Sequence, residues 1–234
     1  MFLEVGLVSL YTGCLCLDRR SVGQTMVSQP LVAVAGLGLI FNQLELSLAI
    51  GSILQLLWMG SSLYGANIPQ NETLASTTAA GALFISMRYG FALNEAAWVL
   101  AVMITAPTAF GCKRAQEWLD RYSSTFSQRA DVMVKSDKPA SLSGLIFTSI
   151  LASLLVHVFI ALVVVSACIA VLYLLEDIQL IGWFESLGLL AWFVLPALAL
   201  AVSLSLVRRR LHLTMFLVTF CVIVALFHSV RGGL

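Results

Sequence analysis

Long apolar segments alternate with short polar breaks along most of the chain. Several segments approach the roughly 20 residues that a helix needs to cross a hydrocarbon core of about 30 Å. These segments are residues 4–17, 73–87, 92–110, 145–175, 186–207 and 211–227. Residues 145–175 exceed one straight crossing, which predicts a tilted, broken or extended helix. The pattern predicts an all-α polytopic membrane protein with about six to eight transmembrane or re-entrant helices.

Two further apolar segments are too short to cross alone. Residues 31–41 and 44–59 are separated by the polar pair Asn42-Gln43. They form either one broken crossing or a hairpin that enters and leaves the bilayer on the same side. Short, interrupted apolar segments are typical of the binding site of a transporter. The basic residues favour the hairpin, because only that arrangement places Arg19 and Arg20 on the cytoplasmic side.

A polar cluster follows the second short segment. Residues 50–76 begin as strongly apolar sequence, break at Gly60-Ser61-Ser62, and then bring polar residues and helix breakers close together. These residues are Gly65, Asn67, Pro69, Gln70, Asn71 and Glu72. Irregular chain at membrane depth leaves costly unpaired backbone groups, so it is tolerated where it lies inside protein or lines a wet cavity. We expect the cluster to line a polar passage; the alternative is that its polar groups only satisfy a helix break.

An extended hydrophilic region lies between residues 111 and 143. Within it, Trp118, Tyr122 and Phe126 recur at four-residue spacing, which is typical of an amphipathic helix on a surface. The region is either a solvated connector or a docking surface for a soluble partner. We expect an N-terminal membrane region (1–110) with a re-entrant substrate-binding segment (31–72), a cytoplasmic amphipathic connector (111–142) and a C-terminal membrane region (143–234).

Basic residues set the expected orientation, because cytoplasmic loops carry an excess of Lys and Arg. The basic residues between Lys113 and Lys138 place that region in the cytoplasm. The chain then crosses the membrane once, which places the acidic loop at 176–185 outside the cell. The next crossing returns the chain to the cytoplasm, where the arginines at 208–210 lie. Counting backwards places residues 69–72 on the cytoplasmic side and both chain ends outside.

Composition narrows the class of protein. Hydrophobic residues make up 60% of the 234 residues and charged residues 11%, whereas about a quarter of a soluble globular domain is charged. No basic patch interleaved with aromatic residues indicates nucleic-acid binding, and the N-terminus is expected to be a retained first span rather than a removed signal peptide. The scattered cysteines lack the spacing of a zinc site, so we expect no metal and no cofactor.

Motifs for catalysis do not occur in the sequence. There is no Ser-His-Asp arrangement, H-E-x-x-H helix or phosphate-binding Gly-Lys-Ser loop. His157 lies in the middle of an apolar segment without a polar partner at i,i+4, so we interpret it as a packing residue. We expect no catalytic phosphoryl-transfer residue in this chain.

The chemistry of the polar cluster suits a sugar. Neutral amides both donate and accept hydrogen bonds, as sugar hydroxyls do, and a carboxylate accepts hydroxyl hydrogens. The expected substrate-binding side chains are those of Gln55, Asn67, Gln70, Asn71 and Glu72. No Lys or Arg occurs between Arg20 and Arg88, which argues against an anionic substrate.

The first third of the chain resembles the membrane IIC subunit of the mannose/fructose/sorbose family of bacterial phosphotransferase-system (PTS) permeases. That family has an acidic residue shortly before Pro-Leu, an IG-x-x-L-[EQ] helix and a P-[PDQ]-[DN]-x-x-LA signature. The matching residues are Asp18, Ser28-Gln29-Pro30-Leu31, Ile50-Gly51 with Leu54-Gln55, Gly65, and Pro69-Gln70-Asn71 with Leu74-Ala75. The resemblance adds Asp18 to the expected substrate-binding residues.

The resemblance also implies a function and partners. A IIC permease binds and translocates a hexose-type sugar together with a IID membrane subunit, while cytoplasmic IIA and IIB subunits phosphorylate the sugar. It implies a multi-pass protein of the bacterial inner membrane and a homo-oligomer of the IIC/IID unit. Two alternatives stay open: an ion-coupled secondary carrier, which would use Glu45, Glu72 or His157, and a degenerate structural or regulatory subunit.

Overall fold

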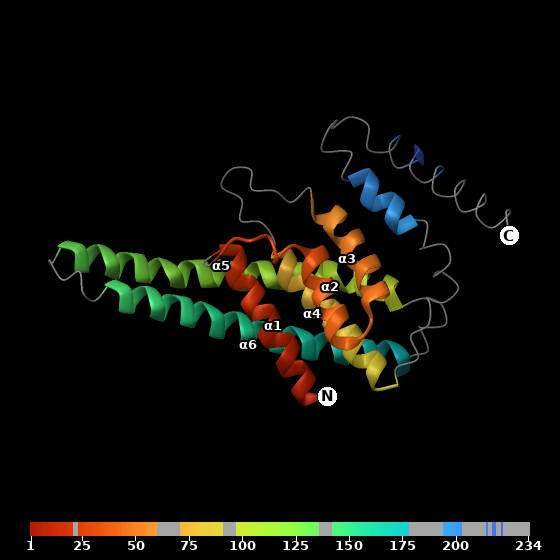
Figure 1. Ribbon diagram of the computed structural model, residues 1–234, viewed down its shortest axis with the longest axis horizontal. Helices are drawn as coiled ribbons and strands as arrows, with labels where there is room; N and C mark the ends of the chain where they lie inside the picture. The colour runs from red at the N-terminus through yellow and green to blue at the C-terminus, as the bar shows by residue number, and fades with distance from the viewer. Residues whose placement is uncertain are drawn as a thin grey trace.

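The computed structural model describes residues 1–20, 23–59, 71–90, 97–135, 142–177 and 194–202, together with residues 214, 217, 218 and 221. Within these residues all regular secondary structure is helical, which confirms the predicted all-α fold class (Figure 1). The helices are α1 (Phe2–Arg20), α2 (Pro30–Phe41), α3 (Leu44–Trp58), α4 (Glu72–Arg88), α5 (Ala97–Lys135) and α6 (Leu142–Asp177). Residues 194–202 are also helical.

Helix α6 has the length and composition of a membrane span. Among the described residues, Ser143–Glu176 is the one helix long and apolar enough to cross a bilayer, and two shorter apolar helices, α2 and α3, accompany it. At about 1.5 Å per residue, the 36 residues of α6 extend over roughly 54 Å, well beyond a hydrocarbon core of about 30 Å. Of the three forms that the sequence allowed, the broken one is wrong, because α6 is one continuous helix. The protein is an all-α membrane protein.

Helices α1 and α4 lie antiparallel, and ion pairs join them near both ends. At one end, Glu4 Oε1 lies 3.2 Å from Arg88 Nε. At the other end, Arg19 Nη1 lies 3.1 Å from Glu72 Oε1. Solvent-exposed ion pairs contribute only about 0–1 kcal/mol each, so their main effect here is to fix the register of the two helices.

Close packing holds α1 and α4 together between these ion pairs. Thr12 Oγ1 donates a hydrogen bond to Thr77 Oγ1 over 3.0 Å. At Gly81 the helices approach so closely that an added Cβ atom would lie 2.4 Å from Cγ1 of Val8. Small residues at such contacts let membrane helices pack closely where no hydrophobic effect drives them together.

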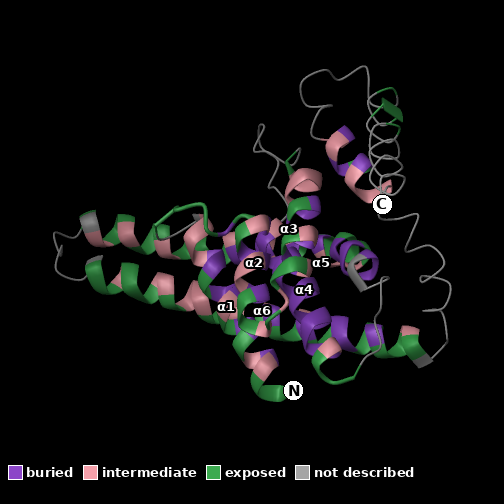
Figure 2. Cartoon of the chain, turned by 45° about the vertical axis from the view of Figure 1, so that its right-hand side comes forward, coloured by how far each residue is buried: buried purple, intermediate pink, exposed green. Residues whose placement is uncertain are grey.

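Helix α4 lies at the centre of the molecule. Its residues from Thr73 to Ser86 are all buried, and it contacts α1, α2, α5 and α6. Figure 2 shows this concentration of buried residues around α4, whereas exposed residues lie on the outer helices. The many Ala, Ser, Thr and Gly residues of α4 suit this position, because their short side chains let several helices approach at once.

Helices α2 and α3 form an antiparallel hairpin. Asn42 ends α2 in the left-handed conformation, with a φ of 57°, and α3 begins two residues later at Leu44. A Cβ atom added at Gly51 would lie 3.1 Å from the Cα atom of Leu31, so the two helices run side by side. Because the two helices are antiparallel, the C-terminus of α3 lies beside the N-terminus of α2. This geometry is that of the hairpin and not of one broken crossing.

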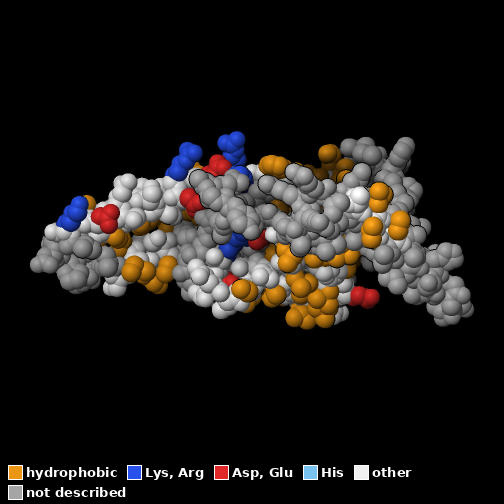
Figure 3. Space-filling view, turned by 90° about the horizontal axis from the view of Figure 1, so that it is seen from above, with side chains coloured by type: hydrophobic (Ala, Val, Ile, Leu, Met, Phe, Trp, Pro, Cys, Tyr) orange, Lys and Arg blue, Asp and Glu red, His pale blue; other side chains and the backbone are white. Residues whose placement is uncertain are grey.

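Helices α5 and α6 form a second, much longer hairpin, which extends away from the other helices (Figure 1). The segment that the sequence suggested as a span and the hydrophilic region after it share one helix, α5, which contains Pro107 in its interior. Trp118 and Tyr122 stack on α5 with ring centroids 5.9 Å apart. In the view of Figure 3, Lys and Arg side chains lie mainly on the half of the molecule that holds this hairpin, and hydrophobic side chains gather most densely on the other half.

Candidate functional site

The candidate site lies where the first turns of α2 and α4 come together. The first N–H groups of a helix have no partner within the helix and need one from elsewhere. Asn71 supplies one for α4, because its Oδ1 accepts a hydrogen bond from the Leu74 N–H over 3.1 Å. Gln55 supplies one for α2, because its Oε1 accepts from the Leu31 N–H over 3.4 Å. Two of the predicted sugar-binding residues therefore also satisfy helix N-termini.

Thr73 links the two helix starts. Its Oγ1 donates to the carbonyl oxygen of Ser28, just before α2, over 2.6 Å. The same oxygen accepts a hydrogen bond from Arg19 Nη1 over 3.3 Å. Both Thr73 and Ser28 are buried, so these contacts join α1, α4 and the loop before α2 inside the protein.

Two carboxylates and one guanidinium border this junction. Arg19 pairs with Glu72, and these side chains are 20% and 22% exposed, so water or a solute can reach both. Asp18 accepts hydrogen bonds from Thr25 N at 2.9 Å and Thr25 Oγ1 at 2.7 Å, and from Ser28 N at 3.3 Å. These bonds, above all the one from the Thr25 backbone, hold the pKa of the Asp18 carboxyl below its usual value.

The charge of this group of residues disfavours an anionic ligand. Asp18 and Glu72 are acidic and Arg19 is basic, so the three side chains sum to a formal charge of −1. The guanidinium of Arg19 is already paired with a carboxylate. The structure thus brings one arginine to the site that the sequence interpretation had not included, and still leaves the site suited to a neutral polar solute.

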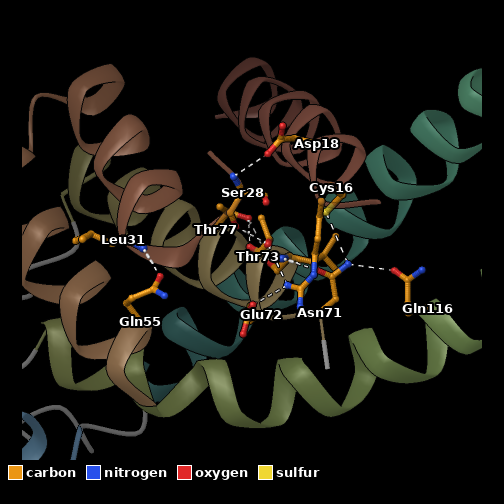
Figure 4. A network of polar contacts seen from close by, with 12 residues as sticks. Cys16, Asp18, Ser28, Leu31, Gln55, Asn71, Glu72, Thr73, Thr77 and Gln116 are labelled. Carbon is orange, nitrogen blue, oxygen red and sulfur yellow. Dashed lines mark hydrogen bonds and ion pairs between the residues drawn. The ribbon is translucent and has the colours of Figure 1, made fainter. Parts of the chain in front are cut away.

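A chain of buried polar side chains runs from Asn71 to α5 and α6. Asn71 Nδ2 donates to Gln116 Oε1 over 3.1 Å, and His157 Nε2 lies 3.3 Å from the same oxygen. Gln116 Nε2 donates to Asp120 Oδ1 over 2.9 Å. Asn71, Gln116 and His157 are at most 5% exposed. Figure 4 shows Gln116 reaching Asn71 on one side of the junction and Gln55 reaching Leu31 on the other.

His157 has polar partners, which corrects one observation made from the sequence. Its Nδ1 lies 2.8 Å from the carbonyl oxygen of Ser153, four residues before it, and 3.4 Å from the Ser153 hydroxyl. A search for partners at i−4 as well as i+4 would have found this serine. The contact with Gln116, 41 residues away in sequence, has no local pattern that predicts it.

The structure brings together part of the predicted set of residues. Asp18, Asn71 and Glu72 meet at the junction of α1 and α4, and Gln55 lies beside the start of α2. Asn67 and Gln70 lie outside the described residues. Arg19, Ser28, Thr73, Gln116 and His157 were not expected at the site.

This arrangement is suited to holding a polar solute. Among the described residues, no group of three His, Cys, Asp or Glu side chains could bind a metal ion. The side chains offer amides, hydroxyls and a partly exposed carboxylate, which exchange hydrogen bonds with a polyhydroxylated molecule. Gln55 is half-buried, and its amide carries both the oxygen that bonds to Leu31 and a nitrogen that can donate hydrogen bonds.

Comparison with known proteins gives one family. The comparison with curated proteins yields no match. The family model described as the PTS system sorbose-specific IIC component matches residues 2–231, almost the whole chain and far beyond the first third that carries the resemblance in sequence. The chain therefore belongs to the family of PTS system sorbose-specific IIC components.

Proposed function

We propose that this chain is the membrane-embedded IIC permease component of a sugar phosphotransferase system in the bacterial inner membrane. It binds and translocates a hexose-type sugar together with a IID subunit, while IIA and IIB subunits phosphorylate the sugar on the cytoplasmic side. The observation that carries the proposal is the junction of the α2 and α4 starts, where Asp18, Gln55, Asn71 and Glu72 lie around two helix N-termini.

The chemistry of the junction supports a neutral sugar as the solute. Glu72 accepts hydroxyl hydrogens and is partly exposed, and Gln55 has a donor for a sugar oxygen. The net negative charge of the junction disfavours a sugar phosphate. A free sugar would therefore bind here, and phosphorylation would weaken its hold on the site and help its release.

The α2–α3 hairpin supports a change of access. It is attached to the junction through the contact between Gln55 and Leu31, and Thr73 joins α4 to the loop before it. Transporters change access by moving repeats or hairpins against a scaffold around a fixed site. The buried α4 is the scaffold in this proposal, and the hairpin is the moving element.

Vesicle uptake tests the proposal against an ion-coupled carrier. Right-side-out, energy-depleted vesicles contain this chain with its IID, IIA and IIB subunits and enclose the general phosphoryl carriers, with or without phosphoenolpyruvate. They are supplied with radiolabelled sorbose, fructose or mannose. We expect uptake of at least one sugar to require phosphoenolpyruvate and to survive an ionophore. Uptake that an ionophore abolishes and that ignores phosphoenolpyruvate would instead establish the carrier, for which Glu45, Glu72 and His157 are candidates.

A further inference from the structure

A groove with both polar and apolar lining residues lies between α5 and α6, and it shares Gln116 and His157 with the chain of buried polar side chains described above. Its volume is about 480 Å³. Polar side chains line it at three- and four-residue spacing on α5 and at four-residue spacing on α6, so each helix turns one polar stripe towards the other. The polar lining residues are Gln116, Asp120, Ser123 and Ser127 on α5, and Ser149, Ser153 and His157 on α6.

The groove is not a closely packed helix interface. Protein interiors hold few voids larger than a water molecule, and the contact of Gly81 with Val8 shows how closely helices of this protein pack elsewhere. A groove of this size that is lined by serine hydroxyls holds water or a ligand, because hydroxyls that face empty space would lack hydrogen-bond partners. The serines lie where α5 and α6 face each other, and their short side chains leave space between the two helices.

The lining combines hydrogen-bonding groups with a larger apolar surface, which comes from Leu119, Phe126, Ala130, Leu145, Ile146 and Ile150. No Lys or Arg is among the residues that line the groove, and Asp120 and His157 are its ionisable side chains. The serine hydroxyls and the Gln116 amide donate and accept hydrogen bonds, as sugar hydroxyls require. Phe126 adds an aromatic surface for the apolar face of a sugar ring. Small-molecule sites are commonly concavities of about 300–1,000 Å³, a range that includes this one.

The inner end of the groove reaches the candidate site. Gln116 lines the groove and bonds to Asn71, and His157 lines it and contacts the same Gln116 oxygen. These side chains are buried, whereas Ser123 and Ser127 near the outer end are exposed. Direct hydrogen bonds through Gln116 therefore connect the inner end of the groove to Asn71, the residue that caps α4.

We infer that the α5–α6 groove is a second binding site for the transported sugar, adjoining the Asn71–Glu72 site on the translocation route. The inference rests on the proposed function, because it takes the ligand to be the same neutral sugar. It assigns a binding role to Ser123 and Ser149, which no pattern in the sequence singled out.

Cysteine protection tests the site directly. The IIC–IID complex carries Ser149→Cys in a background with the exposed Cys14 and Cys221 changed to serine. Thr148→Cys is the matched control, because Thr148 is exposed and does not line the groove. We expect the sugar that the wild-type complex takes up to slow maleimide labelling at position 149 at least about threefold and to leave labelling at position 148 unchanged.

Other occupants of the groove give different results. Labelling at position 149 that sugar does not slow indicates a groove that holds only water. If a water-soluble maleimide labels the cysteine at position 149 in isolated IIC but not in the complex, a segment of a partner subunit fills the groove. A cysteine at position 149 that stays unlabelled in both isolated IIC and the complex shows that water does not reach the groove. Each of these three results overturns the inference.

Removing hydroxyl groups provides a second measurement. The double variant Ser123→Ala with Ser149→Ala keeps the shape of the groove, and Ser124→Ala with Thr148→Ala removes two hydroxyls from exposed positions beside it. We expect the groove variant to weaken apparent sugar affinity about five- to 25-fold, and the control to match wild type. Equal affinity in both variants contradicts the second site. If the wild-type complex itself takes up no sugar, the proposed function fails instead.

Discussion

Asn71 combines two structural roles at the residue scale. Its Oδ1 caps α4 and its Nδ2 bonds to Gln116, so one amide holds a helix start and connects it to α5. Substitution by alanine removes both contacts and leaves the buried Leu74 N–H and Gln116 oxygen with fewer partners. Serine retains a hydroxyl that caps a helix well but does not reach Gln116.

We expect Asn71→Ala to lower the free energy of unfolding by about 1–2 kcal/mol, and Asn71→Ser to recover a large part of that loss. Thermal unfolding in detergent micelles measures both. A serine variant as unstable as the alanine variant would show that the cap contributes little. An alanine variant as stable as wild type would contradict both roles.

Asp18 makes stability depend on pH. Its pKa in the folded protein lies below the ordinary aspartate value, because Thr25 and Ser28 donate hydrogen bonds to the carboxylate. A lowered folded-state pKa gives stabilisation that is complete above the unfolded-state value of about 4 and is lost as pH falls through the folded-state value.

The variant Asp18→Asn should therefore melt at a lower temperature than wild type at pH 7. The gap should narrow as pH falls below about 4, because wild type then also loses its charge. Melting curves over a pH series give the comparison, with Asp131→Asn on the exposed part of α5 as control. A gap that stays constant from pH 7 to pH 3 would argue against the role of this carboxylate.

Residue types in the sequence predicted part of the site and not the rest. Gln55, Asn71 and Glu72 were predicted because polar side chains beside apolar membrane segments are costly without a role, and Asp18 was predicted from the family resemblance. Arg19 was noted only for its charge, and Gln116 was not singled out. Their partners lie 53 and 45 residues away along the chain, in Glu72 and Asn71, so only the packing of helices brings them together.

At the scale of elements, the α1–α4 pair depends on a close approach at Gly81. Alanine at this position places a methyl group 2.4 Å from Val8, a stiff β-branched side chain that is fully buried. Gly111 on α5 is the matched control, because an added Cβ atom meets nothing within 4 Å there.

We expect Gly81→Ala to destabilise the protein by about 1–3 kcal/mol through overpacking, which outweighs the gain in helix propensity of up to about 1 kcal/mol. Gly111→Ala should be neutral or slightly stabilising, because alanine has the higher helix propensity and its methyl group meets no neighbour there. Adding Val8→Ala to Gly81→Ala should restore part of the lost stability. Equal melting temperatures for the two single variants would show that the helices can separate without cost.

The short α2–α3 hairpin could be predicted from the sequence, whereas the long α5–α6 hairpin could not. The polar pair at 42–43 and the length of each apolar segment indicated two short helices. Hydropathy changes sharply near Gly111, which suggested that a span ends there, yet α5 continues as one helix from Ala97 to Lys135. Hydropathy indicates whether a segment lies in lipid or in water. It does not show where a helix ends, because one helix can continue from the membrane into water.

At the scale of the whole molecule, the two hairpins are arranged around the buried helix α4. The buried α4 presents its N-terminus at the junction, the α2–α3 hairpin borders that junction, and the α5–α6 groove leads to it through Gln116. The composition and the apolar segments predicted a membrane protein. The family match, which covers residues 2–231, agrees with that prediction over nearly the full chain. The arrangement around α4 depends on contacts between distant segments, so no local pattern could predict it.

The most direct test of sugar binding at the junction compares Gln55→Ala with Glu45→Gln. Both residues lie on α3; Gln55 borders the junction, whereas Glu45 is exposed near the hairpin turn. The measurement is the apparent affinity for sugar in phosphoenolpyruvate-dependent uptake by right-side-out vesicles that contain the IIC, IID, IIA and IIB subunits and enclose the general phosphoryl carriers. We predict a loss of about 1–3 kcal/mol for Gln55→Ala, roughly five- to 150-fold, and no change for Glu45→Gln. Wild-type affinity in a correctly folded Gln55→Ala complex would contradict a sugar site at the junction.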